Sequence, residues 1–357
     1  GVQTCALPIC EDRCCSFYEF LCVCRGMLEY VLKALLLIAS VSLRSFHGIF
    51  TALSLSNDSG YEFSVFMSSL LTESAELLVS FCAFQIQLRT GKTQRYNYSL
   101  RDILLWAVPS CLHVIANNLY FVIIKISDSP ITQQVFGSLE VVLVGLANVV
   151  ILQQPLSRIQ WASIILLASS VASIQIAKSG SNHLEMPLLP VLLTIVSSGL
   201  SGISGVITEK LMKGKKDVSI FQQNIWLSFW GAVLNFICLV VGNGRRFPQE
   251  MSLMHFNGYA LLTVANTVAM GLVTVGILKY MSTVVKSFTS SASLVMTSML
   301  SSIIFNVDLS MSFYLGVITL GIAMYLYRSY PAERRKVLPL TPVETEKPVA
   351  ESIEDVQ

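Results

Sequence analysis

FNGYALLTVANTVAMGLVTVGILKY, residues 256–280, carries a single charged side chain, Lys279, close to its end. An α-helix needs about 20 apolar residues to cross roughly 30 Å of membrane hydrocarbon, and this stretch is long enough to do so. Comparable stretches recur along almost the whole chain. The sequence therefore predicts an all-α polytopic membrane protein with about ten transmembrane helices, near 31–54, 63–88, 101–125, 130–152, 158–178, 187–212, 221–243, 256–280, 283–305 and 309–328.

The composition agrees with this class. The chain has 357 residues, of which 53% are hydrophobic and 13% are charged. A soluble domain carries about 25% charged residues, roughly twice that share. The formal net charge of +2 does not indicate a nucleic-acid partner. The partner that the composition itself predicts is the lipid bilayer.

Basic residues alternate along the chain and predict its orientation. Segments 89–101, 210–216 and 328–336 together hold half of the 24 Lys and Arg residues. Connections 55–62, 126–129 and 306–309 hold none. Because basic residues are enriched on the cytosolic side of membrane proteins, both termini and the even-numbered connections are expected in the cytosol. Arg245 and Arg246 lie on the opposite side and run against this rule.

The two ends of the chain differ from the apolar body. Residues 1–26 hold six of the nine cysteines and precede the first methionine, Met27, so we interpret them as a non-native or disordered leader. Residues 27–328 form the predicted ten-helix membrane domain, with halves of about 31–178 and 187–328. Residues 329–357, with four prolines and mixed charge, are predicted to be a disordered cytosolic tail.

A weak internal repeat relates the two halves. LSRIQWASIILL at 156–167 aligns with LSMSFYLGVITL at 309–320, each a polar start, an aromatic residue and an apolar helix. This pairs the fifth helix with the tenth, and places Gln133 opposite Lys286. Halves of five spans each would have opposite orientations, the arrangement expected of an alternating-access transporter. Chance similarity between apolar helices is the alternative explanation.

Four ionisable residues interrupt the predicted spans: Glu73, Glu76, Glu140 and Lys286. A charge at bilayer depth costs several kcal/mol unless it faces a partner or a wet cavity, so these residues mark a functional interior. Glu209, where the sixth helix reaches the cytosol, is instead expected to be a solvated boundary residue.

Polar residues at helical spacing suggest what lines that interior. His113 and Asn117 share a face of the third helix, and Gln133 and Glu140 share a face of the fourth. These residues could contact a substrate or hydrogen-bond between helices. In the sixth helix, small residues at 198, 201, 202 and 205 favour close helix packing.

Enzymatic chemistry is not indicated. Gly91-Lys92-Thr93 lacks the glycine that a phosphate-binding loop needs five residues earlier, where Ile86 stands. The four histidines have no second metal ligand at helical spacing, and no nucleophile motif is present. We therefore expect neither an enzyme nor a metal or cofactor site, and transport driven by gradients fits better.

Several motifs occur in the order seen in one family. They are VPSCLHVIANNLYF (108–121), SPITQQVFGSLEV (129–141), LSRIQWAS (156–163), SGISGVITEKLMK (201–213), QQNIWL (222–227) and LKYMSTVVKSF (278–288). Together with TESAELL at 72–78, this pattern resembles the nucleotide-sugar transporters, in the branch of CMP-sialic acid and UDP-galactose carriers. The similarity spans roughly residues 60–330.

This resemblance implies a fold of ten helices in two inverted five-helix halves. It implies exchange of a cytosolic nucleotide sugar for a lumenal nucleoside monophosphate, across a Golgi or ER membrane, and it allows a homodimer. Carried over residue by residue, it also implies substrate-binding positions at Asn117, Asn118, Gln133, Ser201, Gly202, Gly205, Asn224 and Lys286, with Lys286 as the phosphate ligand.

Departures from the family pattern change the expected site. His113 and Thr132 replace tyrosines at candidate substrate-binding positions, so stacking on the base should be weaker. Glu76 stands where the family has lysine, and Leu139 takes the place of another lysine with Glu140 following it. Glu73 keeps a family carboxylate, so we assign Glu73, Glu76 and Glu140 to specificity or coupling.

The lost lysines bear on the substrate. A nucleotide sugar carries about two negative charges, and each pocket lysine can stabilise it by a few kcal/mol at an effective dielectric near 20. The carboxyls would oppose such a ligand unless they are protonated or paired, for example with Lys286. Two alternatives to nucleotide-sugar exchange therefore stay open: a non-transporting scaffold or regulatory relative, and a carrier of a neutral or cationic solute.

Overall fold

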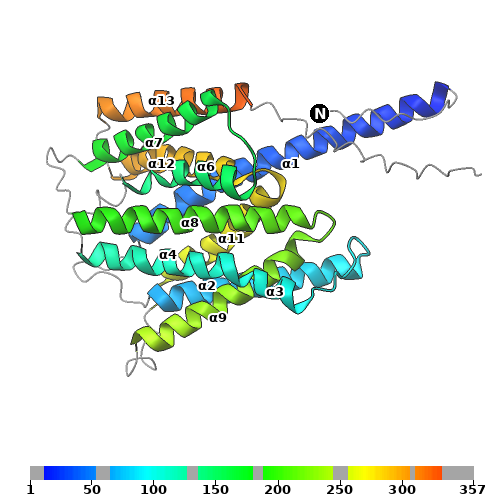
Figure 1. The fold of residues 1–357 in the computed structure, drawn as a ribbon, viewed down its shortest axis with the longest axis horizontal. Helices are drawn as coiled ribbons and strands as arrows, with labels where there is room; N and C mark the ends of the chain where they lie inside the picture. The colour runs from blue at the N-terminus through cyan, green and yellow to red at the C-terminus, as the bar shows by residue number, and fades with distance from the viewer. Residues whose placement is uncertain are drawn as a thin grey trace, which may run out of the picture.

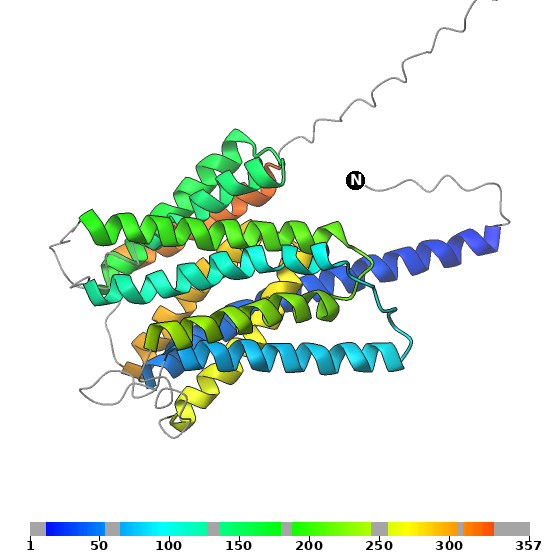
Figure 2. The same ribbon diagram turned by 60° about the horizontal axis from the view of Figure 1, so that its bottom comes forward.

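The computed structural model describes residues 12–53, 65–126, 136–179, 188–243, 256–305 and 310–331. Within these ranges every regular element is a helix and no strand occurs. Most of the helices run along one long direction, and the N-terminal part of α1 projects beyond the others (Figures 1 and 2). The helices are α1 (Asp12–Leu53), α2 (Val65–Arg89), α3 (Leu100–Leu105), α4 (Ala107–Ile126), α6 (Glu140–Ile151), α7 (Arg158–Ser179), α8 (Leu188–Gly214), α9 (Ile220–Asn243), α11 (Gly258–Tyr280), α12 (Thr283–Phe305) and α13 (Met311–Ser329).

Six of the described helical segments are long and apolar enough to cross a membrane. They are Phe66–Arg89, Leu100–Leu119, Leu188–Gly214, Ile220–Val241, Gly258–Tyr280 and Met311–Ser329. Their outer faces present many exposed large apolar side chains, as expected where the surrounding solvent is lipid. The structure thus agrees with a polytopic α-helical membrane protein.

Helix boundaries follow local chemistry. α11 begins at Gly258 because the side chain of Asn257 accepts a hydrogen bond from the Ala260 amide at 2.7 Å. α3 begins after Ser99, whose side chain and that of Asp102 form a capping box. α11 and α12 join through only residues 281–282, as the sequence predicts. The boundary of the leader near Met27 stays a prediction, since α1 continues back to Asp12. Residues 332–357 of the predicted tail lie outside the described residues.

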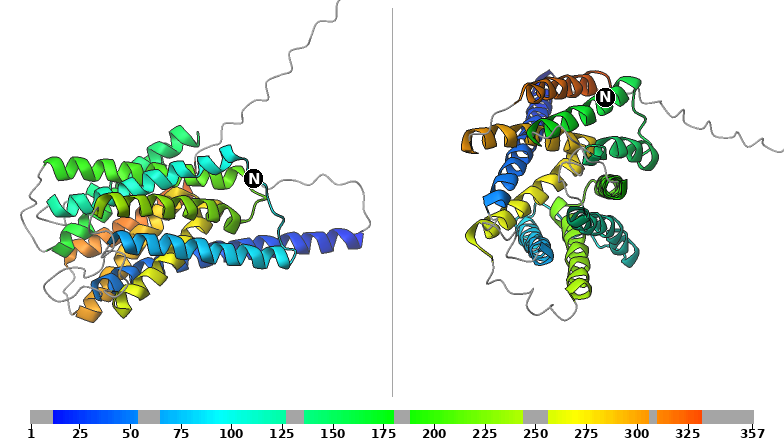
Figure 3. Two further views of the ribbon diagram at one scale, coloured as in Figure 1. Left: turned by 90° about the horizontal axis from the view of Figure 1, so that it is seen from below. Right: turned by 90° about the vertical axis from the view of Figure 1, so that its left-hand side faces the viewer.

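The helices pack in pairs that combine the two halves of the chain. α7 packs along α13 and α2 along α9, while α8 packs on α4 and α6, and α1 packs on α11 and α12. The end-on view in Figure 3 shows these helices around a common interior. The main apolar core, with Val144, Ile164, Leu167, Val206 and Val284 fully buried, joins α6, α7, α8, α12 and α13.

Polar contacts gather several helix ends at one end of the bundle, which we call the basic end: the ends of α2, α8 and α11 with residues 90–99, 215–219 and 281–282. Gln222 exchanges hydrogen bonds with the Tyr96 backbone, accepting from its amide at 3.1 Å and donating to its carbonyl at 2.5 Å. Lys215 forms an ion pair with Asp102 at 2.9 Å. α3 and the α8–α9 connection lie together at this end, on the right of Figure 1.

Candidate functional site: a charged cavity between the helices

A cavity of about 600 Å³ lies inside the bundle. Helices α1, α2, α4, α6, α8, α9, α11 and α12 all contribute residues to its wall. Among the described residues, five charged side chains line it: Arg44, Glu73, Glu76, Glu140 and Lys286. The four residues that the sequence marks as a functional interior are therefore brought together in one place.

Two of the carboxyl groups come from α2 and face glycines of the other half. A Cβ atom at Gly231 of α9 would lie 2.5 Å from Glu73 Oε2. A Cβ at Gly271 of α11 would overlap the Glu76 carboxyl group. Ser228 also reaches Glu76 Oε2 at 3.5 Å, the limit of a hydrogen bond. The two glycines thus make room for the carboxyls at the contact of α2 with α9 and α11.

Glu140 and Lys286 face the cavity from α6 and α12. Ser201 of α8 donates a hydrogen bond to Glu140 Oε1 at 3.2 Å. Among the described residues, neither Glu140 nor Lys286 has an ion-pair partner within 4.0 Å. The pairing of Lys286 with Glu76 or Glu140 that the sequence left open is therefore not made in this structure. Both residues also line a smaller neighbouring cavity of about 170 Å³.

His113 and Asn117 line the large cavity from α4, as their shared helical face predicts. Asn117 Nδ2 lies 3.3 Å from His113 Nε2, and both side chains are exposed within the cavity. Ser201 and Gly205 line it from α8. This arrangement offers uncharged hydrogen-bonding groups on one wall and charges of both signs on the others, which suits a polar, ionised ligand.

Comparison with known proteins shows the family of the chain. A family model described as "Nucleotide-sugar transporter" matches residues 29–328. The chain belongs to the nucleotide-sugar transporter family. CMP-sialic acid transporter 1 of Oryza sativa subsp. japonica is 31% identical over 312 residues, covering 84% of this chain and 94% of that protein. UDP-galactose transporter senju of Drosophila melanogaster is 29% identical, covering 82% and 86%.

A solved crystal structure shares the fold at low sequence identity. It aligns with a TM-score of 0.61 and 14% identity, covering 83% of this chain and 98% of that one. The named relatives are transporters and not enzymes, in agreement with the prediction from sequence. Among the described residues, no three His, Cys, Asp or Glu side chains lie close enough to hold a metal ion.

Three residues that the family resemblance assigns to the substrate lie outside the cavity lining. Asn118 donates to the Val114 carbonyl at 2.8 Å and contacts Cys238 of α9. Asn224 is fully buried and donates to Ser80 at 2.9 Å, which joins α9 to α2. Gly202 faces Val144, 2.9 Å from where its Cβ would stand, the close helix packing that its small-residue pattern favours. Gln133 and Thr132 lie outside the described residues.

Arg44 is a cavity residue that sequence reasoning missed. It stands within the apolar stretch 31–54, so the same rule that marked the four other charges could have found it. Its Nη2 atom donates to Thr274 of α11 at 3.4 Å, and its Nε atom is buried without a partner. His47, one turn further along α1, also lines the cavity and lies 3.2 Å from Thr267.

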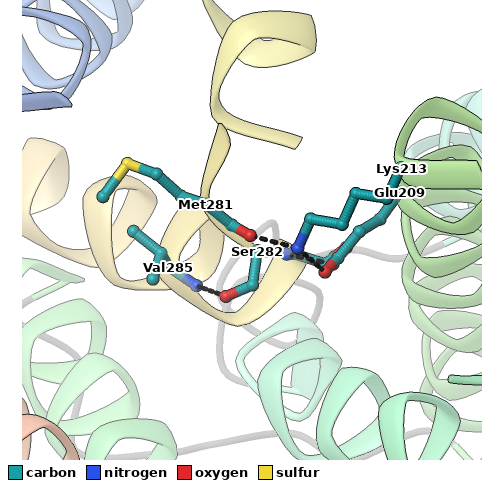
Figure 4. Close-up of polar contacts among 6 residues, drawn as sticks. Glu209, Lys213, Met281, Ser282 and Val285 are labelled. Atoms are coloured by element: carbon teal, nitrogen blue, oxygen red, sulfur yellow. Dashed lines mark hydrogen bonds and ion pairs between the residues drawn. The ribbon is translucent and has the colours of Figure 1, made fainter. Parts of the chain in front are cut away.

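Glu209 corrects another expectation. Instead of being solvated, its side chain is fully buried. Glu209 Oε2 accepts from the Thr283 amide at 2.6 Å and from its hydroxyl at 2.7 Å, while Oε1 pairs with Lys213 at 2.6 Å. Lys213 also donates to the Met281 carbonyl, and Figure 4 shows it reaching across from α8 to the α11–α12 junction. This contact, which we call the Glu209 latch (Glu209, Lys213, Met281 and Thr283), lies at the basic end.

Proposed function

We propose that this protein is a nucleotide-sugar antiporter that exchanges a cytosolic nucleotide sugar for a lumenal nucleoside monophosphate in a Golgi or ER membrane. The observation that carries the proposal is a cavity of about 600 Å³, of the size that small-molecule sites have, inside a member of this family. Lys286 is proposed to bind phosphate there. Asn117, His113 and Ser201 would hydrogen-bond the base, ribose or sugar.

Helix packing supports the two inverted halves that the sequence predicts. Exchanging the halves turns α1, α2, α4, α6 and α7 into α8, α9, α11, α12 and α13. Under this exchange the packing of α8 on α4 and α6 becomes that of α1 on α11 and α12. The α2–α9 and α7–α13 pairs map onto themselves. When the short α3 is counted with α4 as one span, five described spans of each half correspond, and this two-fold relation is the pattern of an inverted repeat.

One departure from this symmetry supports alternating access. α8 packs against both α11 and α12, where the Glu209 latch lies. The symmetric counterpart would join α1 to α4 and α6, and over the described residues α1 makes no comparable contact with them. Among the described residues, contacts that hold the bundle closed in this way therefore occur at the basic end. A carrier that alternates would exchange this latch for contacts at the other end.

The basic end is proposed to face the cytosol, with both chain termini on that side. Lys210, Lys213, Lys215 and Lys216 follow one another there. Lys210 donates to the Ile151 carbonyl at 3.0 Å, which brings the α6–α7 connection to the same end. The enrichment of basic residues on the cytosolic side of membranes gives the orientation.

Reconstitution tests the proposal. The purified protein in liposomes preloaded with CMP, UMP or GMP should take up at least one labelled CMP-, UDP- or GDP-sugar. Lys286→Met should abolish that uptake, whereas the matched change Lys216→Met, at an exposed position of the basic end, should leave it intact. Absence of both exchange and thermal stabilisation by every nucleotide would defeat the proposal.

A second candidate, a carrier of a cationic or neutral solute, is favoured by the cavity charges. Over the described part of its wall, three carboxyl groups stand against two cations. If nucleotides fail and a small cationic solute is exchanged instead, with loss on Glu73→Gln, this second function holds. If no solute is transported at all, the remaining hypothesis is a non-transporting scaffold.

A further inference from the structure

A second cation faces the same space as Lys286. Arg44 of α1 and Lys286 of α12 both line the large cavity, and α1 packs directly on α12. Ser40 donates to Thr289 Oγ1 at 3.2 Å and fixes the register of the two helices. Arg44 lies one turn beyond Ser40, and Lys286 lies one turn before Thr289. Because Ser45 also donates to the Ser293 carbonyl, the two helices run parallel, and Arg44 and Lys286 lie on opposite sides of the Ser40–Thr289 contact. They are about 10 Å apart along the helix axes, a separation over which their long side chains still interact electrostatically.

These two cations do not form ion pairs with the carboxyl groups around them. Within the described part of the chain, neither Arg44 nor Lys286 has a carboxylate within 4.0 Å. Arg44 makes one long side-chain hydrogen bond, to Thr274, and its buried Nε atom has no partner. Arginine is costly to bury without partners, because its guanidinium group carries five donors and a permanent charge. An unsatisfied guanidinium edge at a polar cavity indicates an anionic ligand.

Glu140 provides negative charge near both cations when the cavity is empty. It interacts electrostatically with Arg44 and with Lys286 without forming an ion pair with either. Ser201 on α8 donates a hydrogen bond to it. A phosphate group entering between α1 and α12 could therefore contact both cations while Glu140 stays bound to α8.

We propose that Arg44 is a second phosphate-binding side chain of this cavity, acting with Lys286 on the phosphate groups of the nucleotide ligand. The proposal rests on the proposed nucleotide-sugar transport. It lessens the charge problem that the sequence raised, because Arg44 on α1 supplies one cation where two are absent, at Glu76 and Leu139. A guanidinium group also binds phosphate through two parallel hydrogen bonds, which a lysine cannot do.

The test compares nucleosides with their monophosphates on the full-length protein. Dissociation constants are measured for cytidine, uridine and guanosine and for CMP, UMP and GMP. The ratio of the nucleoside constant to the monophosphate constant isolates the contribution of the phosphate. Arg44→Gln should lower this ratio about tenfold, which corresponds to about 1.4 kcal/mol, and leave nucleoside binding unchanged. Arg44→Lys should lower it less, because the charge is kept.

Arg89→Gln is the matched control, since Arg89 is an exposed arginine at the end of α2 outside the cavity; it should leave the ratio unchanged. A ratio in Arg44→Gln equal to that of the unchanged protein overturns the inference. If Arg44→Gln does not fold, Glu140→Gln gives the answer: removing the competing carboxylate should tighten monophosphate binding, and unchanged or weaker binding overturns it. If the unchanged protein binds none of the six ligands, the proposed function itself fails.

Discussion

The carboxyl group of Glu76 occupies the space in which a side chain at Gly271 would begin. Glu76 lies on α2 in the first half of the chain and Gly271 on α11 in the second, and both line the central cavity. Glu73 and Gly231 of α9 repeat this relation one turn away along α2. Each acidic side chain of α2 is thus accommodated by an absent side chain in the other half.

Gly271→Ala should therefore displace Glu76 or separate α2 from α11. Overpacking of this kind costs about 1–3 kcal/mol, so the midpoint of thermal unfolding in detergent should fall. Adding Glu76→Ala to Gly271→Ala should recover most of the loss, because the two positions compete for one space.

Gly321→Ala is the matched control for this change. Gly321 lies within α13, and a Cβ at this position would meet no atom within 4 Å. Alanine forms helix more readily than glycine, so this variant should be as stable as the unchanged protein or slightly more stable. Equal losses in the two variants would show that the Glu76 contact does not matter.

The two positions where the family has lysine should respond differently when lysine is restored. Glu76 lines the large cavity, whereas Leu139 lines neither cavity. Glu76→Lys exchanges a negative for a positive charge beside the ligand and should tighten CMP, UMP or GMP binding about tenfold or more. Leu139→Lys should leave it nearly unchanged. Titration calorimetry of both variants measures this, and a stronger gain from Leu139→Lys would contradict the observed cavity wall.

Apolar length located several of the helices, although α6 begins at Glu140, ten residues after the predicted start of the span 130–152. The stretch 256–280 predicts α11 to within two residues at its start, and 283–305 matches α12. The charged interior was also predictable, because an ionisable residue within an apolar span is costly in the membrane and therefore marks a functional position. Arg44, in the apolar stretch 31–54, could have been predicted by the same rule.

Long-range partners were not predictable. Glu209 resembles a solvated helix-end residue, and its burial depends on the Thr283 amide, 74 residues away. Asn224 likewise donates a hydrogen bond to Ser80, which lies 144 residues away in the sequence. No local pattern encodes such pairings, so a family position can lie behind the cavity wall instead of on it.

Breaking the ion pair of the Glu209 latch should destabilise the basic end. Lys213→Met leaves the fully buried Glu209 carboxylate without its cation. The loss of a partner in a fully buried pair costs about 3–5 kcal/mol, and because the Lys213 side chain is 31% exposed we expect about 2 kcal/mol. Thermal unfolding in detergent measures it. Lys216→Met, at the exposed neighbour, should change little; if it costs as much, the ion pair is not the cause.

Weakening the same latch should also open the cavity toward the basic end. Asn117 is exposed within the cavity, so a cysteine placed there, with the nine native cysteines replaced, reports access to it. In sealed vesicles of known orientation, a membrane-impermeant thiol reagent added at the basic end should label this cysteine slowly. Glu209→Gln removes the charge that holds Lys213 and weakens the acceptor for Thr283, so labelling from that end should become several-fold faster. Labelling from the opposite end should slow at the same time, since a carrier that alternates cannot be open on both sides; faster labelling from both ends would indicate a loosened bundle and contradict alternating access.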